Sequence, residues 1–109
     1  MTYFIGYGLR TNKGVELYQG DRDLFFDKLV YAIELVGGEV LFAGTGTGIW
    51  EGVQEPAGSI TFIADDSDDV RQHIQATLVA LAIVFEQDSI AFTQGNTLLV
   101  GADGALVLT

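Results

Sequence analysis

Apolar and polar residues alternate along several short stretches, which is the pattern of strands with one buried face. Residues 39–53 keep this period with an interruption at Glu51, and they are interpreted as one long strand, or as two strands broken by glycines. Residues 55–58, with Pro56 and Gly58, predict a turn because proline and glycine punctuate elements. The other predicted strands are residues 3–10, 59–64 and 90–93, followed by a C-terminal hairpin of residues 97–100 and 105–108.

Two further stretches repeat apolar residues at helical spacing. The first begins at Gly20 with Asp21 as the expected N-cap, and it stops at Gly37 and Gly38. The second follows the acidic residues 65–69, where Asp66 or Ser67 is expected to cap the helix. Their expected inner faces are Phe25, Phe26, Leu29, Val30, Ile33 and Val36 in the first helix, and Val70, Ile74, Thr77, Leu78, Leu81 and Phe85 in the second.

The predicted order is strand, helix, strand, strand, helix, strand, which is the β-α-β-β-α-β plan of ferredoxin-like α+β domains. The 109 residues suit a single domain spanning residues 1–109, with the C-terminal hairpin as an extension. An antiparallel sheet of this plan carries both helices on one face. The other face is left open, and we expect a partner subunit or a ligand to cover it.

Glycines fall in phase with the strand period at two places in the sequence. Residues two apart share a face of a strand, so each place has one face that is nearly bare of side chains. We predict that the bare faces form a shallow groove for a flat ligand or a peptide; close packing and a twisted or bulged hairpin are the alternatives. The predicted groove comprises Phe4, Gly6, Gly8, Phe42, Gly44, Gly46, Gly48 and Trp50.

Both predicted helices carry apolar residues beyond their inner faces. Ala76, Val79 and Ile83 lie opposite Leu81 on the expected wet side of the second helix. The first helix has a similar stripe of Leu24, Tyr31 and Leu35. A helix that is apolar all round is usually buried on more than one side. Contact between the two helices can absorb one stripe, so we predict an oligomer contact through Ala76, Val79 and Ile83.

The charge and composition of the chain limit the kinds of partner and location that can be expected. The net charge is −10, from 15 acidic and 5 basic residues, and no two basic residues are adjacent. Direct nucleic-acid binding is therefore not expected, whereas a basic protein partner is compatible with the charge. There are no cysteines, and the longest apolar run, residues 78–85, is too short to cross a membrane. Without a visible leader segment, a cytoplasmic location is expected.

The candidate chemistry is sparse. Residues 44–48 alternate glycine and threonine but lack the following helix of a phosphate loop, and the acidic residues 65–69 suit a helix cap better than a metal site. We expect no metal and no cofactor. His73 is the lone histidine, one turn after Asp69, and is a weak candidate for acid/base catalysis because no matched nucleophile accompanies it.

The sequence favours a non-enzymatic binding or regulatory module that acts as a homo-oligomer. One alternative is an acidic inhibitor that imitates nucleic acid and blocks a nucleic-acid-binding protein. The other alternative is a small oligomeric ferredoxin-like enzyme that uses His73 in acid/base chemistry. The fold plan itself hosts many functions and does not choose among the three.

Overall fold

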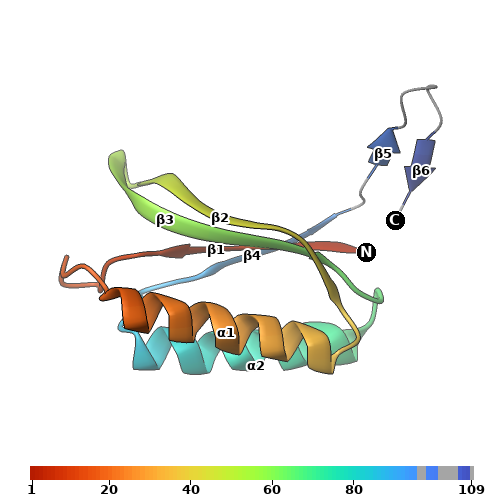
Figure 1. Ribbon diagram of the computed structural model, residues 1–109, viewed down its shortest axis with the longest axis horizontal. Coiled ribbons are helices and arrows are strands. Elements are labelled where there is room, and N and C mark those ends of the chain that lie inside the picture. The colour runs from red at the N-terminus through yellow and green to blue at the C-terminus, as the bar shows by residue number, and fades with distance from the viewer. Residues whose placement is uncertain (96–97, 101–105, 109) are drawn as a thin grey trace.

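The computed structural model of the chain, which describes residues 1–95, 98–100 and 106–108, shows a four-stranded antiparallel sheet with both helices on one face (Figure 1). The strand order is β2-β3-β1-β4, so the α+β ferredoxin-like prediction is confirmed. The elements are β1 (Thr2–Gly8), α1 (Gln19–Leu35), β2 (Glu39–Trp50), β3 (Val53–Ile63), α2 (Asp68–Val84), β4 (Ala91–Gly95), β5 (Leu98–Val100) and β6 (Leu106–Leu108).

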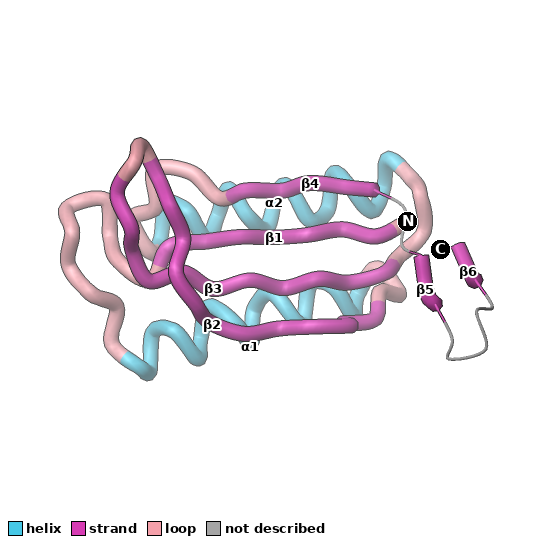
Figure 2. The backbone as a smooth tube through the Cα atoms, turned by 90° about the horizontal axis from the view of Figure 1, so that it is seen from above, coloured by secondary structure: helices cyan, strands magenta, loops and turns pink. Residues whose placement is uncertain are grey.

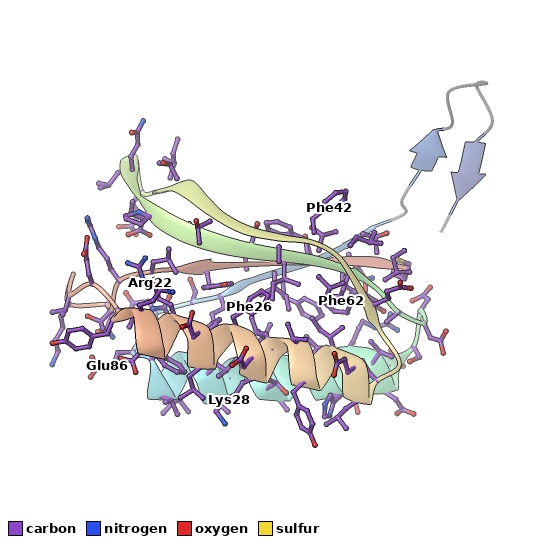
Figure 3. All side chains as sticks on the ribbon, in the orientation of Figure 1. Arg22, Phe26, Lys28, Phe42, Phe62 and Glu86 are labelled. Carbon is purple, nitrogen blue, oxygen red and sulfur yellow. The ribbon has the colours of Figure 1, made fainter. Side chains whose placement is uncertain are left out.

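The core lies between the sheet and the helices. Tyr3, Ile5 and Tyr7 alternate along β1 with residues of the open face, and all three are buried. Across the ladder they pair with Phe62, Ile60 and Gly58 of β3, which share their face. Aromatic contacts bind these layers together, including Tyr7 on Phe25 of α1 at 4.3 Å between ring centroids. Figure 3 shows Phe62 and Phe26 between sheet and helices, whereas Phe42 points away from the opposite face.

The two helices begin in different ways. α2 is capped by Ser67, whose Oγ accepts a hydrogen bond from the Val70 amide at 3.2 Å, as one of the two sequence alternatives predicts. For α1 the expected Asp21 cap is wrong. The helix begins at Gln19, three residues before the start that an Asp21 cap implies, and its N-cap residue Tyr18 makes no side-chain cap hydrogen bond. Asp21 lies instead in the first turn, where its carboxylate still favours the positive end of the helix dipole.

The turn between β2 and β3 is not where proline and glycine predict it. It lies at Glu51 and Gly52, whose φ angles of 49° and 78° are those of a two-residue type I′ hairpin turn. The ladder consequently runs from Trp50↔Val53 down to Glu39↔Ile63, interrupted by a register shift between Val40 and Phe42. Residues 55–58 therefore lie inside β3, and the predicted turn there is wrong.

Pro56 is tolerated inside β3 because of its place in the ladder. Its carbonyl accepts a hydrogen bond from the Leu9 amide at 3.1 Å, so its nitrogen faces the same side, just past the end of β1. The Leu9 carbonyl, which would otherwise meet an amide there, accepts from the Leu17 amide at 3.0 Å. The missing donor of proline thus leaves no ladder bond unmade.

The C-terminal hairpin forms a second sheet. β5 and β6 pair antiparallel, from Leu98↔Leu108 to Val100↔Leu106, as the sequence predicts. The turn predicted at residues 101–104 lies outside the described residues. Seen from above, β5 and β6 lie beyond the end of the four-stranded sheet (Figure 2). In the described part of the chain, neither helix has the length and apolar character to cross a membrane; a cytoplasmic location stays a prediction.

Candidate functional site: a groove on the open face

The open face of the sheet is nearly bare along three strands. Gly6 pairs with Ser59 of β3, which pairs in turn with Gly44 of β2. One step along, Gly8, Ala57 and Gly46 form a second cross-strand row of small residues. Cross-strand partners point to the same face, so the glycines of both strands lie on the face opposite the helices.

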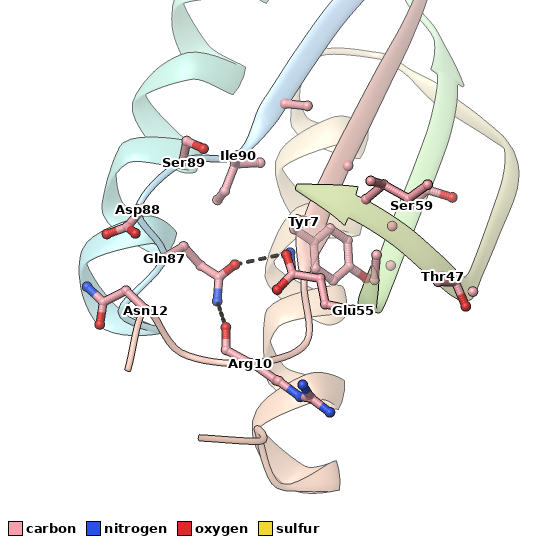
Figure 4. Close-up of a pocket in the computed structure, with 18 of the residues that line it drawn as sticks. Tyr7, Arg10, Asn12, Thr47, Glu55, Ser59, Gln87, Asp88, Ser89 and Ile90 are labelled. Carbon is pink, nitrogen blue, oxygen red and sulfur yellow. Dashed lines mark hydrogen bonds between the residues drawn. The ribbon is translucent and has the colours of Figure 1, made fainter. Parts of the chain in front are cut away.

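A groove of about 880 Å³ occupies this bare surface. Its floor is the end of β1, and its walls are β2 residues 46–49, β3 residues 55–59 and the segment 87–91 before β4 (Figure 4). The loop residues 10–12 and 14 close one end, and Phe4 lies at the other. Small-molecule sites usually measure roughly 300–1,000 Å³, so the groove is large enough for a ligand of nucleoside size.

Gln87 fixes the floor of the groove. Its Oε1 accepts a hydrogen bond from the Gly8 amide at 3.1 Å, and its Nε2 donates to the Arg10 carbonyl at 2.7 Å. Oε1 also lies 3.1 Å from where a Cβ of residue 8 would be, so glycine is the residue that lets the carboxamide approach. The side chain ties the end of β1 to the segment that follows α2, which positions this wall of the groove against its floor.

The Glu55 carboxylate lies above the same floor. Its Oε1 is 3.9 Å from the place a Cβ on Gly8 would take, and Figure 4 shows it close to the Gln87 carboxamide. The side chain is half-buried and makes no hydrogen bond or ion pair with any residue that the structure describes. A carboxylate held in a groove without a partner attracts a cationic group of a ligand.

Other polar groups frame the groove. Arg10 lines it with a guanidinium 3.6 Å from Glu16, and the buried Arg10 Nε has no partner among the described residues. Asp88 and Ser89 are exposed on the wall next to Gln87. Tyr7 reaches the groove from the core side, and burial raises the pKa of its phenol above the ordinary value of 10.0. Burial therefore favours the neutral phenol.

The structure distributes the predicted groove residues unevenly. Five of the eight line the groove: Phe4, Gly6, Gly8, Gly46 and Gly48. Gly44 lines a smaller cavity of about 420 Å³ toward α1, and Phe42 is 73% exposed away from both. The Trp50 side chain lies outside the described part of the chain. Ligand binding by this set stays a prediction.

The sequence reasoning missed Glu55 and Gln87, the two side chains that give the groove its chemistry. Glu55 was assigned to a turn, and a turn residue has no defined face. Gln87 follows the last residues of α2, in a segment with no periodicity. The signal for Glu55 was the Glu51-Gly52 pair, since a turn there places residue 55 on the same face as Gly48.

The weak catalytic candidate His73 lies on α2, beyond the core from the groove, and does not line it. Its Nε2 is buried without a partner in the described part of the chain. The acidic residues before α2 serve the helix: Arg71 pairs with Asp66 and with Asp68 at 2.6 Å each. These two hydrogen bonds, that to Asp68 first, raise the pKa of Arg71.

The predicted oligomer contact lies on the outer side of α2. Val79 is 55% and Ile83 74% exposed, and Ala76 is exposed beside them. Leu24, Tyr31 and Leu35 are likewise exposed on α1. Contact between the helices therefore leaves both stripes open, and the predicted role of the α2 stripe in assembly stays a prediction.

Comparison with known proteins finds structures but no sequence family: no family model and no curated protein matches the chain. A solved structure with the same fold is a phage SAM lyase in complex with S-methyl-5'-thioadenosine. It is 19% identical, with a TM-score of 0.53 over 84% of this chain and 76% of that one. A phage SAM lyase in its apo state is 21% identical, with a TM-score of 0.48 over 84% and 75%.

The comparison with the SAM lyase complex contradicts the predicted non-enzymatic module, because that structure shares the fold and is of an enzyme. An enzyme was only an alternative prediction from the sequence, because no matched nucleophile accompanies His73. At 19% identity the likeness establishes the fold alone. The activity of this chain is therefore taken up as a proposal.

Proposed function

We propose that the chain is an enzyme that binds S-adenosylmethionine, or a closely related sulfonium nucleoside, in the open-face groove and cleaves it. The unpaired Glu55 carboxylate, next to the Gln87 carboxamide over Gly8, carries this proposal. A sulfonium is a fixed positive charge that does not depend on pH, and a half-buried carboxylate is its natural counter-charge. The fold shared with a phage SAM lyase supports the same ligand class.

The shape and charge of the groove suit the rest of such a ligand. Gly46 leaves the backbone of β2 open for a flat purine, because nothing lies within 4 Å of the place its Cβ would take, and the Phe4 ring over Gly6 offers an aromatic surface. The net charge of −10 attracts a cationic ligand from a distance. Arg10, at the opposite end from Phe4, suits the carboxylate of an amino acid chain.

The reaction follows from comparing the two nucleosides. S-methyl-5'-thioadenosine keeps the methyl and adenosyl groups of S-adenosylmethionine and lacks its 2-aminobutyrate chain. Cleavage therefore breaks the bond between sulfur and that chain, and the bonding electron pair stays on sulfur. The carbon that sulfur leaves takes a new bond from the chain's own carboxylate oxygen, which closes a lactone and consumes no co-reactant. The product is a neutral thioether, which no longer attracts Glu55. The carboxylate thus favours substrate over product, and we assign it to binding and orientation.

Calorimetry tests the assignment with two ligands. We expect S-adenosylmethionine to bind and Glu55→Gln to weaken that binding by about tenfold, since a partly solvated charge pair contributes roughly 1–2 kcal/mol. Binding of S-methyl-5'-thioadenosine, which is uncharged at sulfur, should be unchanged in the same variant. Glu34→Gln is the matched control, because it removes the same charge from an exposed position on α1.

Chromatography of the reaction tests the activity itself. S-adenosylmethionine incubated with the protein should disappear as S-methyl-5'-thioadenosine accumulates in equal amount. A protein that binds neither nucleoside at millimolar concentration refutes the proposed ligand class. Equal loss of affinity for both nucleosides in Glu55→Gln refutes the role of Glu55 as the counter-charge.

A further inference from the structure

The outer edge of β2 is an unpaired strand edge. Within the described residues β2 pairs with β3 alone, at one side of the four-stranded sheet. The turn fixes which groups are free, because the closing pair of a two-residue hairpin, here Trp50↔Val53, is a hydrogen-bonded pair. Pairs alternate from there. The amides and carbonyls of Ala43, Thr45, Thr47 and Ile49 therefore point outward.

From Phe42 to Trp50 this edge carries none of the devices that usually protect an edge strand. Exposed edges are normally blocked by charged residues, by proline, or by being very short. From Val40 to Trp50 the chain has no charged residue and no proline. The register shift between Val40 and Phe42 disturbs only the beginning of the strand. The edge at the other side of the sheet, β4, is five residues long by comparison.

The C-terminal hairpin is too small to form a stable sheet by itself. It is a sheet of two strands of three residues each, and isolated two-stranded hairpins are marginally stable in water. Its sequence is apolar throughout: Leu98, Leu99, Val100, Leu106, Val107 and Leu108. It follows β4, and β2 of the same chain lies three strands away, about 14 Å across the sheet. Its strands pair with each other and with no strand of the larger sheet.

We propose that the C-terminal hairpin of one copy adds as strands to the free β2 edge of a second copy. This pairing satisfies the outward groups of β2 and extends the short hairpin into a larger sheet. The facing segments, residues 40–50 of β2 and the hairpin strands 98–100 and 106–108, carry no charged residue, so the seam itself sets no like charges opposite each other although each chain has a net charge of −10. The contact is head-to-tail, and a closing rotation makes a ring of identical subunits. It is independent of the proposed chemistry.

Complementation between two full-length variants tests this pairing. Thr45→Pro removes an outward amide of β2 without touching the β2–β3 ladder, and Thr45→Val is its matched control. Leu99→Pro combined with Val107→Pro breaks the hairpin and leaves β2 intact. We expect light scattering after size exclusion to show an oligomer for wild type and for Thr45→Val. Each proline variant alone should be a monomer of 11.7 kDa.

Mixing the two proline variants is the decisive measurement. One retains a working hairpin and the other a working edge, so the mixture should contain a 1:1 dimer that neither variant forms alone. A second edge variant, Thr45→Lys with Thr47→Lys, blocks the edge by charge if proline lowers expression. A wild type that is monomeric at high concentration, or a mixture of folded variants that remains monomeric, overturns the proposal.

Discussion

Substituting alanine for Gly58 is expected to destabilise the fold through one contact. A Cβ at this position would lie 2.5 Å from Tyr7 Cζ and 2.6 Å from its Cε2 and Oη. The ring cannot move aside freely, because Phe25 packs against it. Residue 58 has no positive φ, so alanine is acceptable to the backbone and the clash alone is measured.

The expected magnitude comes from two opposed effects. Overpacking a well-packed core costs roughly 1–3 kcal/mol. Replacing glycine by alanine lowers the entropy of the unfolded chain, which stabilises by about 0.4–1 kcal/mol. Gly58→Ala should therefore lower the free energy of unfolding by about 1–2 kcal/mol. Gly44→Ala is the matched control, since its Cβ meets nothing within 4 Å, and it should leave stability unchanged or slightly raised.

Urea unfolding followed by circular dichroism measures both variants. With a slope of roughly 1–3 kcal/mol per molar for a small protein, the Gly58→Ala midpoint should fall by about 0.5–1 M. Repeating the substitution in a Tyr7→Ala background removes the ring, and the added cost of alanine at residue 58 should then disappear. Equal stability of Gly58→Ala and Gly44→Ala, or the same cost with and without the ring, would refute the steric reasoning.

Three further outcomes are expected. Ser67→Ala removes the cap of α2 and should lower the free energy of unfolding by about 1 kcal/mol in urea titrations, whereas Ser67→Asp should retain it. Ile83→Asp should reduce self-association on size exclusion if the outer side of α2 is an interface; a folded variant with unchanged elution counts against that contact. Burial raises the pKa of Tyr7, so its neutral form is favoured in the fold; stability should fall as pH rises above about 10, and less steeply in Tyr7→Phe.

The order of strands and helices was predictable because the buried apolar residues of each element recur at the spacing of a strand or a helix. Tyr3, Ile5 and Tyr7 mark one face of β1, and Ile74, Leu78 and Leu81 mark one face of α2, without any knowledge of long-range contacts. The helix N-cap at Ser67 was equally visible, since a short polar side chain there has a local partner. Such features depend on neighbours in sequence, which is why they can be deduced from it.

The turn and the groove depended on contacts between distant residues. Pro56 looked like a turn because its missing donor usually ends a ladder, and only the pairing of Leu9 with Leu17 makes it harmless. Once the turn moved to Glu51 and Gly52, Glu55 became a strand residue facing the groove. The hydrogen bond from Gly8 to Gln87 spans 79 positions in sequence, and no local pattern announces it.

The two rows of small residues on the open face have an energetic consequence for any ligand that settles there. Gly44 and Gly46 present open peptide groups with no rotatable side chain, since nothing lies within 4 Å of the place a Cβ would take at either, so contact with them freezes no rotamers. A flexible site loses conformational entropy each time it binds a ligand. Here the backbone lost that entropy when the protein folded, so binding does not reduce it again. Such a surface is rigid before the ligand binds. Its affinity for a ligand should therefore depend little on conformational change of the protein on binding.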